Sequence, residues 1–343
     1  MQHIRTYIHK HIQMTVSDIS HIPIIDFSLF KSDPEQCGKL ILDAAQNVGF
    51  FYLRNFGFTR NEVEDMFSLS KDFFDTPKEE KSKYAIDKGN IGYSSVRQEA
   101  VDPKNYSQGD YKESFHIGKF KNDEPSQPLP SVFDAEKDKV NKFVTGCHTI
   151  VTQIMECLAI ALEIPESEGG RTWFSSRHAY DTPSNDVLRV LHYPPLNHPN
   201  EVDDIRIGRH SDYGSLTLLF QNGVGGLQIQ ANRDAPNEES IKWLDAPVVD
   251  DCLTVNLGDC LEWWTCNVLR STKHRVIFTP ATQMKPRYSM AYFCQGGQAK
   301  LEPVPSRFIP QSEAHALTKN DDGSPLTAAQ HLAMRLNATY SSY

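Results

Sequence analysis

The chain has 343 residues, of which 39% are hydrophobic and 23% are charged. This composition supplies a sizeable buried core and excludes global disorder, which requires low hydrophobicity together with high net charge. The net charge of −9 disfavours a dedicated nucleic-acid-binding protein, because such proteins usually carry a basic domain. We find no stretch that reads as long and apolar enough to span a bilayer, so we expect neither a membrane nor a nucleic-acid partner. The oligomeric state stays open.

Seven cysteines are scattered along the chain without a CxxC pair. An odd number at irregular spacing indicates neither a disulfide framework nor a cysteine zinc site, and it predicts a reducing compartment. We therefore expect a cytoplasmic location, with the nucleus as a further compartment. Residues 1–20 are predicted to be a flexible tail. The tail carries Arg5 and Lys10 before its first acid, so a mitochondrial presequence is the weaker alternative.

The first part of the chain, residues 21–185, is predicted to be rich in helices. A run of apolar residues at 22–27 predicts a short strand, and the aromatic-rich segment 49–55 predicts a second strand. Between them, a helix is predicted over residues 34–47, because an aspartate and a proline stand at its start.

Two more helices are predicted before residue 186. Thr59 and Glu62 have the capping-box pattern that begins a helix. Residues 75–107 are predicted to be loop-rich, since glycines and a proline interrupt every periodic pattern. The longest helical pattern covers residues 140–162, where apolar side chains recur at helical spacing. We interpret this segment as a core helix that backs a sheet, with a partner-binding helix as the alternative.

From residue 186 onward the pattern changes to short strand-like runs that are separated by glycines, prolines or polar clusters. These runs lie at 187–192, 215–220, 226–230, 252–256, 275–278 and 287–294. Closely spaced strands without a helical pattern between them predict a sandwich or barrel. We therefore predict a mainly β fold with flanking helices, in a single domain over residues 21–343. Its parts are the helix-rich residues 21–185, a β core over 186–300 and a C-terminal helical cap over 301–343.

One pair of residues in the β core has the spacing of metal ligands. His210 and Asp212 are two positions apart, so on an extended backbone both side chains share one face and could reach one ion. The pair alone is weak evidence, because 13 histidines and 44 acids would give about 1.7 such pairs by chance. The surrounding sequence is more specific. It reads IGRHSDYGSLTLLFQNGVGGLQIQ, then VNLGDCLEWWTCNVLRSTKHRVI, then RYSMAYF.

In these segments the sequence resembles the iron(II)- and 2-oxoglutarate-dependent dioxygenases, in their isopenicillin-N-synthase-like branch. The stretches IPIIDFS, AAQNVGFFYLRNFG, FFDTPKEEK, GYSS, DYKESFHIG and LRVLHYPP resemble the same branch, so the likeness covers about residues 22–303. The resemblance implies a double-stranded β-helix, that is, a cupin-like jelly-roll core. It also implies an oxidoreductase that uses Fe(II), 2-oxoglutarate and O2, releases succinate and CO2, and hydroxylates, desaturates or cyclises a small organic metabolite.

The resemblance assigns three residues as iron ligands. The family carries two histidines and one carboxylate on one face of the iron, and this set matches His210, Asp212 and His274. Two imidazoles and a carboxylate hold Fe(II) and leave three coordination positions open. No catalytic residue beyond these ligands is predicted. The remaining histidines are interpreted as core or surface residues, although His116 and His192 are candidates for the pocket lining.

The resemblance also assigns the cosubstrate site. Arg287 and Ser289 match the pair that binds the distal carboxylate of 2-oxoglutarate, and Tyr193 matches a tyrosine that bonds the cosubstrate. A guanidinium takes a carboxylate in a bidentate manner, and the hydroxyl adds a further donor. One position departs from the family pattern. Relatives commonly have asparagine where this chain has Leu191, and this change removes one polar contact with the cosubstrate.

The substrate itself cannot be identified from the sequence. Phe293 lies six positions after Arg287 on the same strand, so both side chains face the same way. We predict Phe293, Tyr93, Lys112 and His116 as candidates for the substrate pocket, with a packing role as the alternative for each.

Three other functions are weighed against this one. A 2-oxoglutarate-independent Fe(II) oxidase of the same fold would place a substrate carboxylate on Arg287 and Ser289. A non-catalytic small-molecule-binding protein would be expected to lose a metal ligand, whereas all three are intact. A zinc hydrolase could use the same ligands, but it would need a general base and would have no use for the arginine–serine pair.

Overall fold

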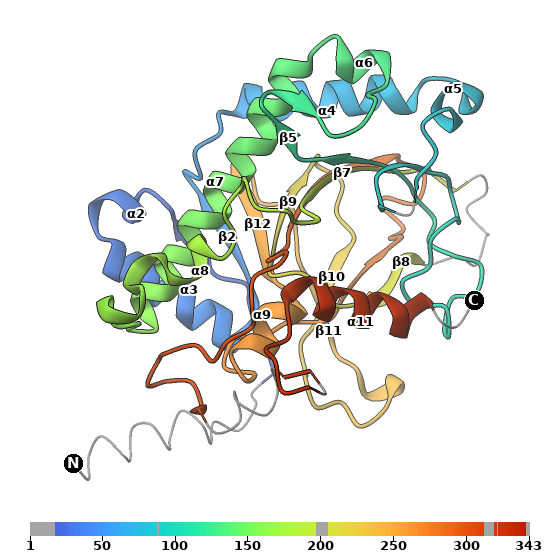
Figure 1. Ribbon diagram of the computed structural model, residues 1–343. Coiled ribbons are helices and arrows are strands. Elements are labelled where there is room, and N and C mark those ends of the chain that lie inside the picture. The colour runs from blue at the N-terminus through green and yellow to red at the C-terminus, as the bar shows by residue number, and fades with distance from the viewer. Residues whose placement is uncertain (1–17, 88, 197–204, 312–318, 321, 341–343) are drawn as a thin grey trace.

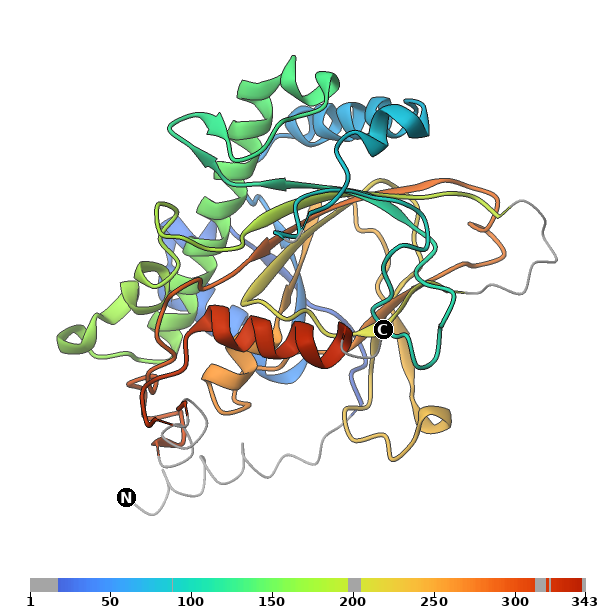
Figure 2. The same ribbon diagram turned by 45° about the vertical axis from the view of Figure 1, so that its right-hand side comes forward.

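Two β-sheets that face each other form the centre of the protein (Figure 1). The computed structural model describes residues 18–87, 89–196, 205–311, 319–320 and 322–340, so most of the predicted tail lies outside the described residues. An eight-stranded sheet has the order β1-β2-β12-β9-β14-β7-β4-β3, and a four-stranded sheet has the order β11-β10-β13-β8. Figure 2 shows the two sheets around a common interior, with helices on the outer side of the larger sheet. The predicted jelly-roll core is confirmed.

The strands of the larger sheet come from both halves of the chain. They are β1 (Ile24–Asp26), β2 (Phe50–Arg54), β3 (Gly92–Ser94), β4 (Glu113–Gly118), β7 (Val187–Tyr193), β9 (Leu216–Gln221), β12 (Cys252–Leu257) and β14 (Arg287–Cys294). Those of the smaller sheet are β8 (Ile205–His210), β10 (Leu227–Gln230), β11 (Trp243–Asp245) and β13 (His274–Ile277). A separate hairpin joins β5 (Phe120–Lys121) to β6 (Glu124–Pro125). The helix-rich part of the chain thus supplies four strands of the main sheet.

The helices lie mostly in the first half of the chain. They are α2 (Leu29–Ser32), α3 (Pro34–Asn47), α4 (Arg60–Phe74), α5 (Lys78–Ser82), α6 (Ser131–Asp134), α7 (Lys137–Ala161), α8 (Trp173–Ser176), α9 (Asp259–Trp264) and α11 (Ala328–Tyr340). Short 3-10 turns occur at 166–168, 170–172 and 238–240.

The predicted helix starts are confirmed at the level of single hydrogen bonds. The carboxylate of Asp33 accepts a bond from the backbone N–H of Gln36 at 3.0 Å, and this caps α3. Thr59 and Glu62 form the expected capping box at the start of α4. These bonds satisfy backbone N–H groups that have no partner inside the helix.

Helix α7 is the core helix that its apolar pattern predicts. Its buried residues include Phe143, Val151, Ile154 and Leu158, and it packs against α3. By length and composition alone this helix could cross a membrane, which corrects our finding that no stretch is apolar enough. Most of its apolar stretch is buried inside the protein, as is usual for a core helix.

The larger sheet separates two apolar cores. On β7, Leu188 and Val190 pack in the core below the helices, whereas Leu191 and Tyr193 face the space between the two sheets. Side chains alternate between the two faces of a strand, so residue parity decides which core a side chain enters. The helix-side core provides most of the buried apolar surface. The inter-sheet core is smaller and holds the polar residues described below.

Several elements were not predicted from the sequence. Strand β4 is buried at all six positions, so it has no alternation of polar and apolar residues to reveal it. Helix α5 and strand β3 lie inside the segment that we expected to be loop. Each has five residues or fewer, and periodicity cannot detect so short an element.

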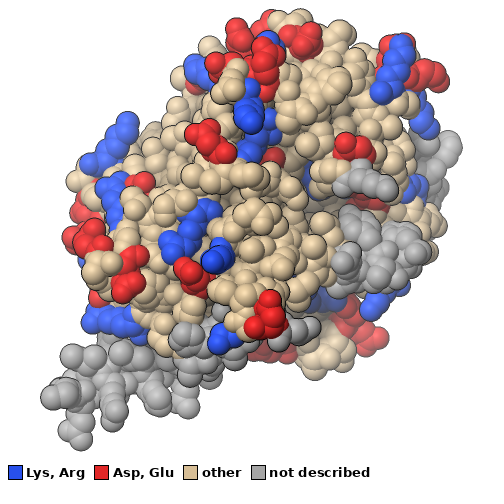
Figure 3. Space-filling view, in the orientation of Figure 1, with Lys and Arg blue, Asp and Glu red and all other residues tan. Residues whose placement is uncertain are grey.

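Charged side chains are mixed in sign over the surface seen in Figure 3. Lysines and arginines alternate with acidic side chains on that face instead of gathering in one basic patch. This distribution agrees with the acidic balance of the sequence.

Candidate active site

The three side chains that we predicted as iron ligands converge at the edge of the smaller sheet. His210 ends β8, His274 begins β13, and the two residues are direct partners across these antiparallel strands. Their ring centroids lie 4.3 Å apart. Oδ1 of Asp212 lies 3.7 Å from Nε2 of each histidine. Among the described residues, this group is one of two in which histidine, cysteine or acidic ligand atoms lie close enough to share an ion.

Hydrogen bonds turn both imidazoles toward a common point. Nδ1 of His210 bonds the carbonyl oxygen of Gly208 at 2.8 Å, and Nδ1 of His274 bonds that of Thr272 at 3.1 Å. A carbonyl oxygen only accepts, so each Nδ1 carries the proton and each Nε2 keeps a free lone pair. Burial lowers the pKa of His210 to about 4. The ring is therefore neutral at physiological pH, as metal binding requires.

The carboxylate of Asp212 is held by its second oxygen. The hydroxyl of Thr217 and the amide of Asn256 both donate to Oδ2, each at 2.6 Å. Thr217 and Asn256 are direct partners on β9 and β12, so the larger sheet fixes the carboxylate from across the interior. This arrangement leaves Oδ1, which faces the two histidines, for an ion. A set of two imidazole nitrogens and one carboxylate oxygen fits Fe(II).

The loop that carries Asp212 is fastened to the start of α9. The backbone N–H of Asp259 donates to the carbonyl oxygen of Asp212 at 2.7 Å. Gly258 permits this close contact, because a Cβ there would lie 2.2 Å from the carbonyl oxygen of Gly214. The Asp259 side chain also accepts bonds from Ser211 and Ser271, which flank the two ligand-bearing segments.

A buried arginine lies at the other end of the interior. Arg287 donates to the hydroxyl of Ser289 at 3.2 Å, to Oε1 of Gln221 at 3.0 Å and to the carbonyl oxygen of Val224 at 3.2 Å. Its guanidinium carbon lies 4.7 Å from the ring centroid of Tyr193. A guanidinium has five N–H groups, so two remain for a ligand. The structure thus brings together the three residues predicted for the cosubstrate and adds Gln221, which sequence reasoning missed.

Comparison with known proteins identifies the family. Residues 184–296 match the model of the 2OG-Fe(II) oxygenase superfamily, and residues 22–136 match the N-terminal model described as non-haem dioxygenase in morphine synthesis. The chain belongs to the 2OG-Fe(II) oxygenase superfamily. It is therefore an oxidoreductase that uses Fe(II), 2-oxoglutarate and O2.

Relatives of this oxygenase align over nearly its whole length. A UPF0676 protein of Schizosaccharomyces pombe is 33% identical and covers 93% of this chain and 92% of its own. A 2-oxoglutarate-Fe(II) type oxidoreductase, ppzD, of Metarhizium rileyi is 30% identical and covers 81% of this chain and 80% of its own.

A solved structure from Neurospora crassa is similar over the same extent. It is the crystal structure of a full-length protein in complex with alpha-KG, which is 2-oxoglutarate. It superposes with a TM-score of 0.74 at 31% identity and covers 92% of this chain and 95% of that one. Further structures hold the same Neurospora protein with alpha-KG and thymine or 5-formyluracil.

The support of Asp212 leads to a first prediction for this oxygenase. Replacing Asn256 with leucine keeps the size of the side chain but removes one of the two donors to Oδ2. We expect the affinity for Fe(II) to fall roughly 10- to 100-fold, as for other groups that orient a metal ligand. Anaerobic calorimetric titration with Fe(II) measures the change. Asn47→Leu, at the exposed end of α3, is the matched control. Unchanged affinity in Asn256→Leu would mean that Asp212 needs no such support.

Leu191, where this chain departs from the family pattern, lies next to the residues predicted to bind the cosubstrate. Leu191 is buried between the sheets as the direct partner of Ser289 across β7 and β14. An apolar side chain therefore stands beside the carboxylate-binding pair, where relatives offer an amide. On β7 itself the neighbouring interior residues are Arg189 and Tyr193, and both carry hydrogen-bond donors.

Phe293, a predicted candidate for the substrate pocket, lies near the residues that support the iron ligands. It is the cross-strand partner of Thr217, which bonds Asp212. The guanidinium carbon of Arg189 lies 5.0 Å from the centre of the Phe293 ring. Nε of Arg189 is buried and has no hydrogen-bond partner among the described residues. A charged donor therefore lies over one face of an aromatic ring near the iron ligands. Sequence reasoning missed Arg189, although its parity with Tyr193 on β7 could have revealed it.

Of the other three pocket candidates, Tyr93 lies outside the pocket, whereas His116 and Lys112 already have partners within the protein. Tyr93 lies on the helix side of the sheet, in the larger core, and its hydroxyl donates to Glu113 at 2.6 Å. It cannot line the inter-sheet pocket because its strand parity points it the other way. His116 does face the interior, but its two ring nitrogens already bond Ser114 and the carbonyl oxygen of Asn90. Burial lowers the pKa of His116 to about 3, so it is a neutral wall residue.

Lys112 is also engaged within the protein. It is buried and forms an ion pair with Glu99, with Asp110 4.0 Å away. Its ammonium group is therefore already neutralised and is not a free cation for a substrate. This pair lies beyond Arg189 at the wall of the interior, and the charge of Arg189 also contributes to the lowered pKa of Glu99. This side of the interior is thus lined by polar groups that pair with one another.

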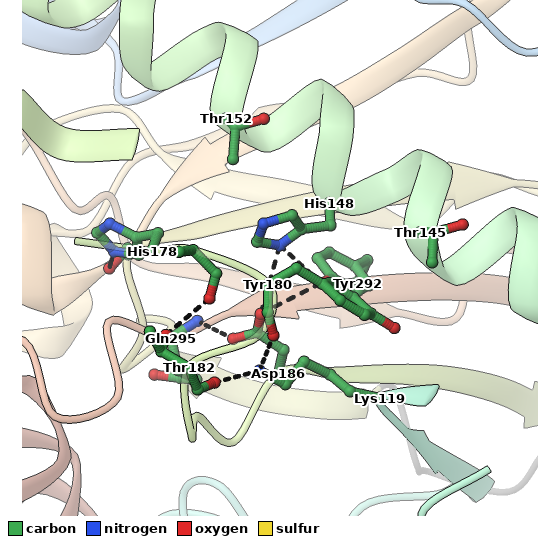
Figure 4. A network of polar contacts seen from close by, with 12 residues as sticks. Lys119, Thr145, His148, Thr152, His178, Tyr180, Thr182, Asp186, Tyr292 and Gln295 are labelled. Carbon is green, nitrogen blue, oxygen red and sulfur yellow. Dashed lines mark hydrogen bonds and ion pairs between the residues drawn. The ribbon is translucent and has the colours of Figure 1, made fainter. Parts of the chain in front are cut away.

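A second cluster with metal-ligating atoms lies on the other face of the large sheet (Figure 4). It contains His148 of α7, Asp186 and Cys294, all buried. Oδ1 of Asp186 accepts from the backbone N–H of Gln295 at 2.7 Å, and Tyr292 donates to Oδ2 at 3.3 Å. These bonds satisfy the carboxylate without an ion, and His148 contacts the Tyr292 hydroxyl and so links α7 to β14. We assign the cluster a structural role.

Proposed function

We propose that this oxygenase oxidises a small planar heterocycle of the pyrimidine-base class. In the proposed site, His210, Asp212 and His274 hold Fe(II), while Arg287 and Ser289 hold 2-oxoglutarate with help from Tyr193. The observation that carries the substrate class is the pairing of Arg189 with Phe293 beside the iron ligands. This conclusion goes beyond the family assignment, which is common to oxygenases of many substrates.

The chemistry of that pair favours a flat ligand with a carbonyl group. An aromatic face stacks on a planar ring, and such contacts contribute roughly 0.5–1.5 kcal/mol beyond simple burial. The free Nε–H of Arg189 is a donor to a carbonyl oxygen at the edge of the ring. Glu99 and Asp110 nearby are already engaged with Lys112, so the donor that this wall leaves for a ligand is Arg189. A pyrimidine base meets each of these conditions.

The structures of the Neurospora protein support the same class. That protein has been crystallised with thymine and with 5-formyluracil, each together with alpha-KG. In the thymine complex the alignment has 30% identity and covers 93% of this chain. Neither fact transfers the substrate by itself. Together with the arginine and phenylalanine that this chain places beside its own iron ligands, they favour a pyrimidine over a sugar, lipid or amino-acid substrate.

The residues of the site divide the work of the reaction. When bound, Fe(II) and 2-oxoglutarate supply the oxidising chemistry with O2 and release succinate and CO2. Arg287 orients the distal end of the cosubstrate, and Arg189 with Phe293 would present one C–H bond of the substrate to the metal. Asp212 and His274, each 7% exposed, would hold the metal where bulk water has little access.

Substrate-dependent succinate formation tests the proposal. The enzyme, loaded with Fe(II) and 2-oxoglutarate in air, is offered thymine, uracil, 5-formyluracil and cytosine, alongside a panel of phenols, amino acids and dicarboxylates. We expect a pyrimidine to raise succinate formation well above the uncoupled rate. A phenol or a carboxylate that does so while every pyrimidine fails would contradict the proposed class. An oxidised product without succinate would favour the 2-oxoglutarate-independent oxidase.

Variants then locate the substrate. Arg189→Leu removes the free donor, and we expect the KM for the active pyrimidine to rise roughly 10- to 100-fold, since a hydrogen bond from a charged group contributes about 1.5–3 kcal/mol. The affinity for 2-oxoglutarate should stay unchanged. Arg60→Gln is the control, because that exposed side chain pairs with Asp251 at the surface, away from the site. An unchanged KM in Arg189→Leu would remove Arg189 from the substrate site.

We also propose that this oxygenase is cytoplasmic and acts on a freely diffusing small molecule. All seven cysteines are free, which supports a reducing compartment. The net charge of −9 and the mixed charges of Figure 3 support a protein without a nucleic-acid partner. The burial of α7 supports a protein without a membrane span.

A further inference from the structure

A second arginine is buried at the cosubstrate end of the interior. Arg206 lies on β8, four positions before the predicted iron ligand His210, and it is 0% exposed. Its Nη2 donates to the carbonyl oxygens of Thr282 and Lys285, at 3.1 and 3.0 Å. Its Nε and Nη1 are buried without a hydrogen-bond partner among the described residues. Three of its five N–H groups are therefore available for a ligand.

The same aromatic ring lies next to both buried arginines. The guanidinium carbon of Arg206 is 5.9 Å from the ring centroid of Tyr193, and that of Arg287 is 4.7 Å from it. Arg206 also lies over Phe278, at 4.4 Å. Tyr193 is the cross-strand partner of Arg287, so these side chains enclose one end of the space between the sheets.

The two guanidinium groups lack a counter-ion in the part of the chain that the structure describes. Arg287 bonds only neutral oxygens there, and Arg206 bonds only backbone carbonyls. Burial and the positive charge of Arg287 lower the pKa of Arg206 to about 10, which still leaves it charged at neutral pH. Buried charges are normally paired, because an unpaired charge in the interior is costly. Two like charges at one end of a pocket therefore require an anion.

We propose that Arg206 is a second binding residue for the distal carboxylate of 2-oxoglutarate, opposite Arg287 and Ser289. It supplies charged donors at the end of the pocket where Leu191 offers none. Arg287 and Ser289 belong to the arginine–serine pattern of the family and lie on β14 of the larger sheet. Arg206 is not part of that pattern and lies on β8 of the smaller sheet. The cosubstrate carboxylate is thus held between both sheets.

The inference rests on the use of 2-oxoglutarate by this oxygenase and not on the pyrimidine substrate. The role of Arg206 can be tested with a pair of related acids. A residue that contacts only the distal carboxylate should discriminate 2-oxoglutarate from 2-oxobutanoate, which has the same keto-acid end and no distal carboxylate. A residue that merely supports the fold should change the binding of both acids to the same extent.

The experiment compares these two acids on the same protein. Full-length protein is loaded anaerobically with Fe(II), without substrate, and titrated with each acid while the visible absorption band of the chelate is followed. For Arg206→Gln we expect the Kd for 2-oxoglutarate to rise 10- to 100-fold and the Kd for 2-oxobutanoate to change less than twofold. Arg206→Lys, which keeps the charge, should recover part of the loss. Arg209→Gln, on the same strand and ion-paired with Glu238, is the control.

Each outcome decides the question. Equal changes for the two acids, or no change for either, overturn the role of Arg206. If Arg206→Gln does not fold, Arg206→Lys is compared with the wild type by the same ratio of the two Kd values, and an unchanged ratio overturns the proposal. Wild-type protein that fails to bind 2-oxoglutarate would instead contradict its use of that cosubstrate. The absence of pyrimidine turnover has no bearing on this titration.

Discussion

His210→Ala should abolish tight binding of Fe(II). The substitution removes one of three converging ligands and leaves Asp212 and His274 with too few donors to hold the ion. We expect the affinity to fall by more than about 100-fold, beyond the range for residues that only orient a ligand. Iron content after anaerobic loading and desalting, together with calorimetric titration, measures the effect. His21→Ala, at an exposed position outside the site, should retain wild-type affinity.

The His210 variant also separates the two clusters of metal-ligating residues. If it kept iron as tightly as the wild type, the assignment of His210, Asp212 and His274 would be wrong, and the group around His148 would have to be reconsidered. A His148→Ala variant provides the comparison. We expect it to keep its iron and to lose thermal stability, because His148 lies 3.4 Å from Tyr292 and links α7 to the sheet.

Arg287→Gln should have the second large effect, on 2-oxoglutarate. Truncating one partner of a buried, hydrogen-bonded charge pair costs about 2–5 kcal/mol, so we expect the Kd to rise roughly 30-fold or more. Fe(II) binding should be unaffected, because Arg287 lies at the opposite end of the interior from the iron ligands. Anaerobic titration of the iron-loaded protein, followed by visible absorption, measures both quantities. The exposed Arg60→Gln variant is the control.

The wild-type titration in the same series also tests the use of the cosubstrate. A saturable absorption band that weakens in Arg287→Gln supports chelation by 2-oxoglutarate and its anchoring by the arginine. A Kd in Arg287→Gln equal to that of the wild type would place the distal carboxylate elsewhere. Iron binding without any band in the wild type would favour an oxidase that does not use 2-oxoglutarate.

The sequence predicted the elements with strong local signals. The capping residues Asp33 and Thr59 and the apolar spacing of α7 are local patterns, and the observed helices agree with them to within a few residues. Six of the predicted strands are likewise present in the core. Strands β4 and β8 were missed. The first is buried along its whole length, and neither carries the alternation that identifies a half-buried strand.

The candidate site was predictable only where a motif names its residues. His210, Asp212, His274 and Arg287 stand in recognisable segments, and the fold brings the first three together. Asn256, Gln221 and Arg206 stand on other strands, and only the sheet register shows which residues they approach.

Tyr93 illustrates the opposite error. Its segment resembles the family, but a resemblance in sequence does not state which face of the sheet a side chain occupies. Because side chains alternate along a strand, Tyr93 lies under the helices, whereas its neighbours on the strand face the pocket side.

The alternation along β14 has a consequence for how such an enzyme can change over time. Arg287, Ser289, Ala291 and Phe293 face the reaction space, whereas Met290, Tyr292 and Cys294, set between them, belong to the helix-side core. Adjacent positions of one strand thus serve different purposes, since one set faces the ligands and the other packs the helix-side core. A new substrate preference could arise at Phe293 without disturbing the packing that keeps the protein folded, and a lineage can diversify its chemistry on an unchanged scaffold.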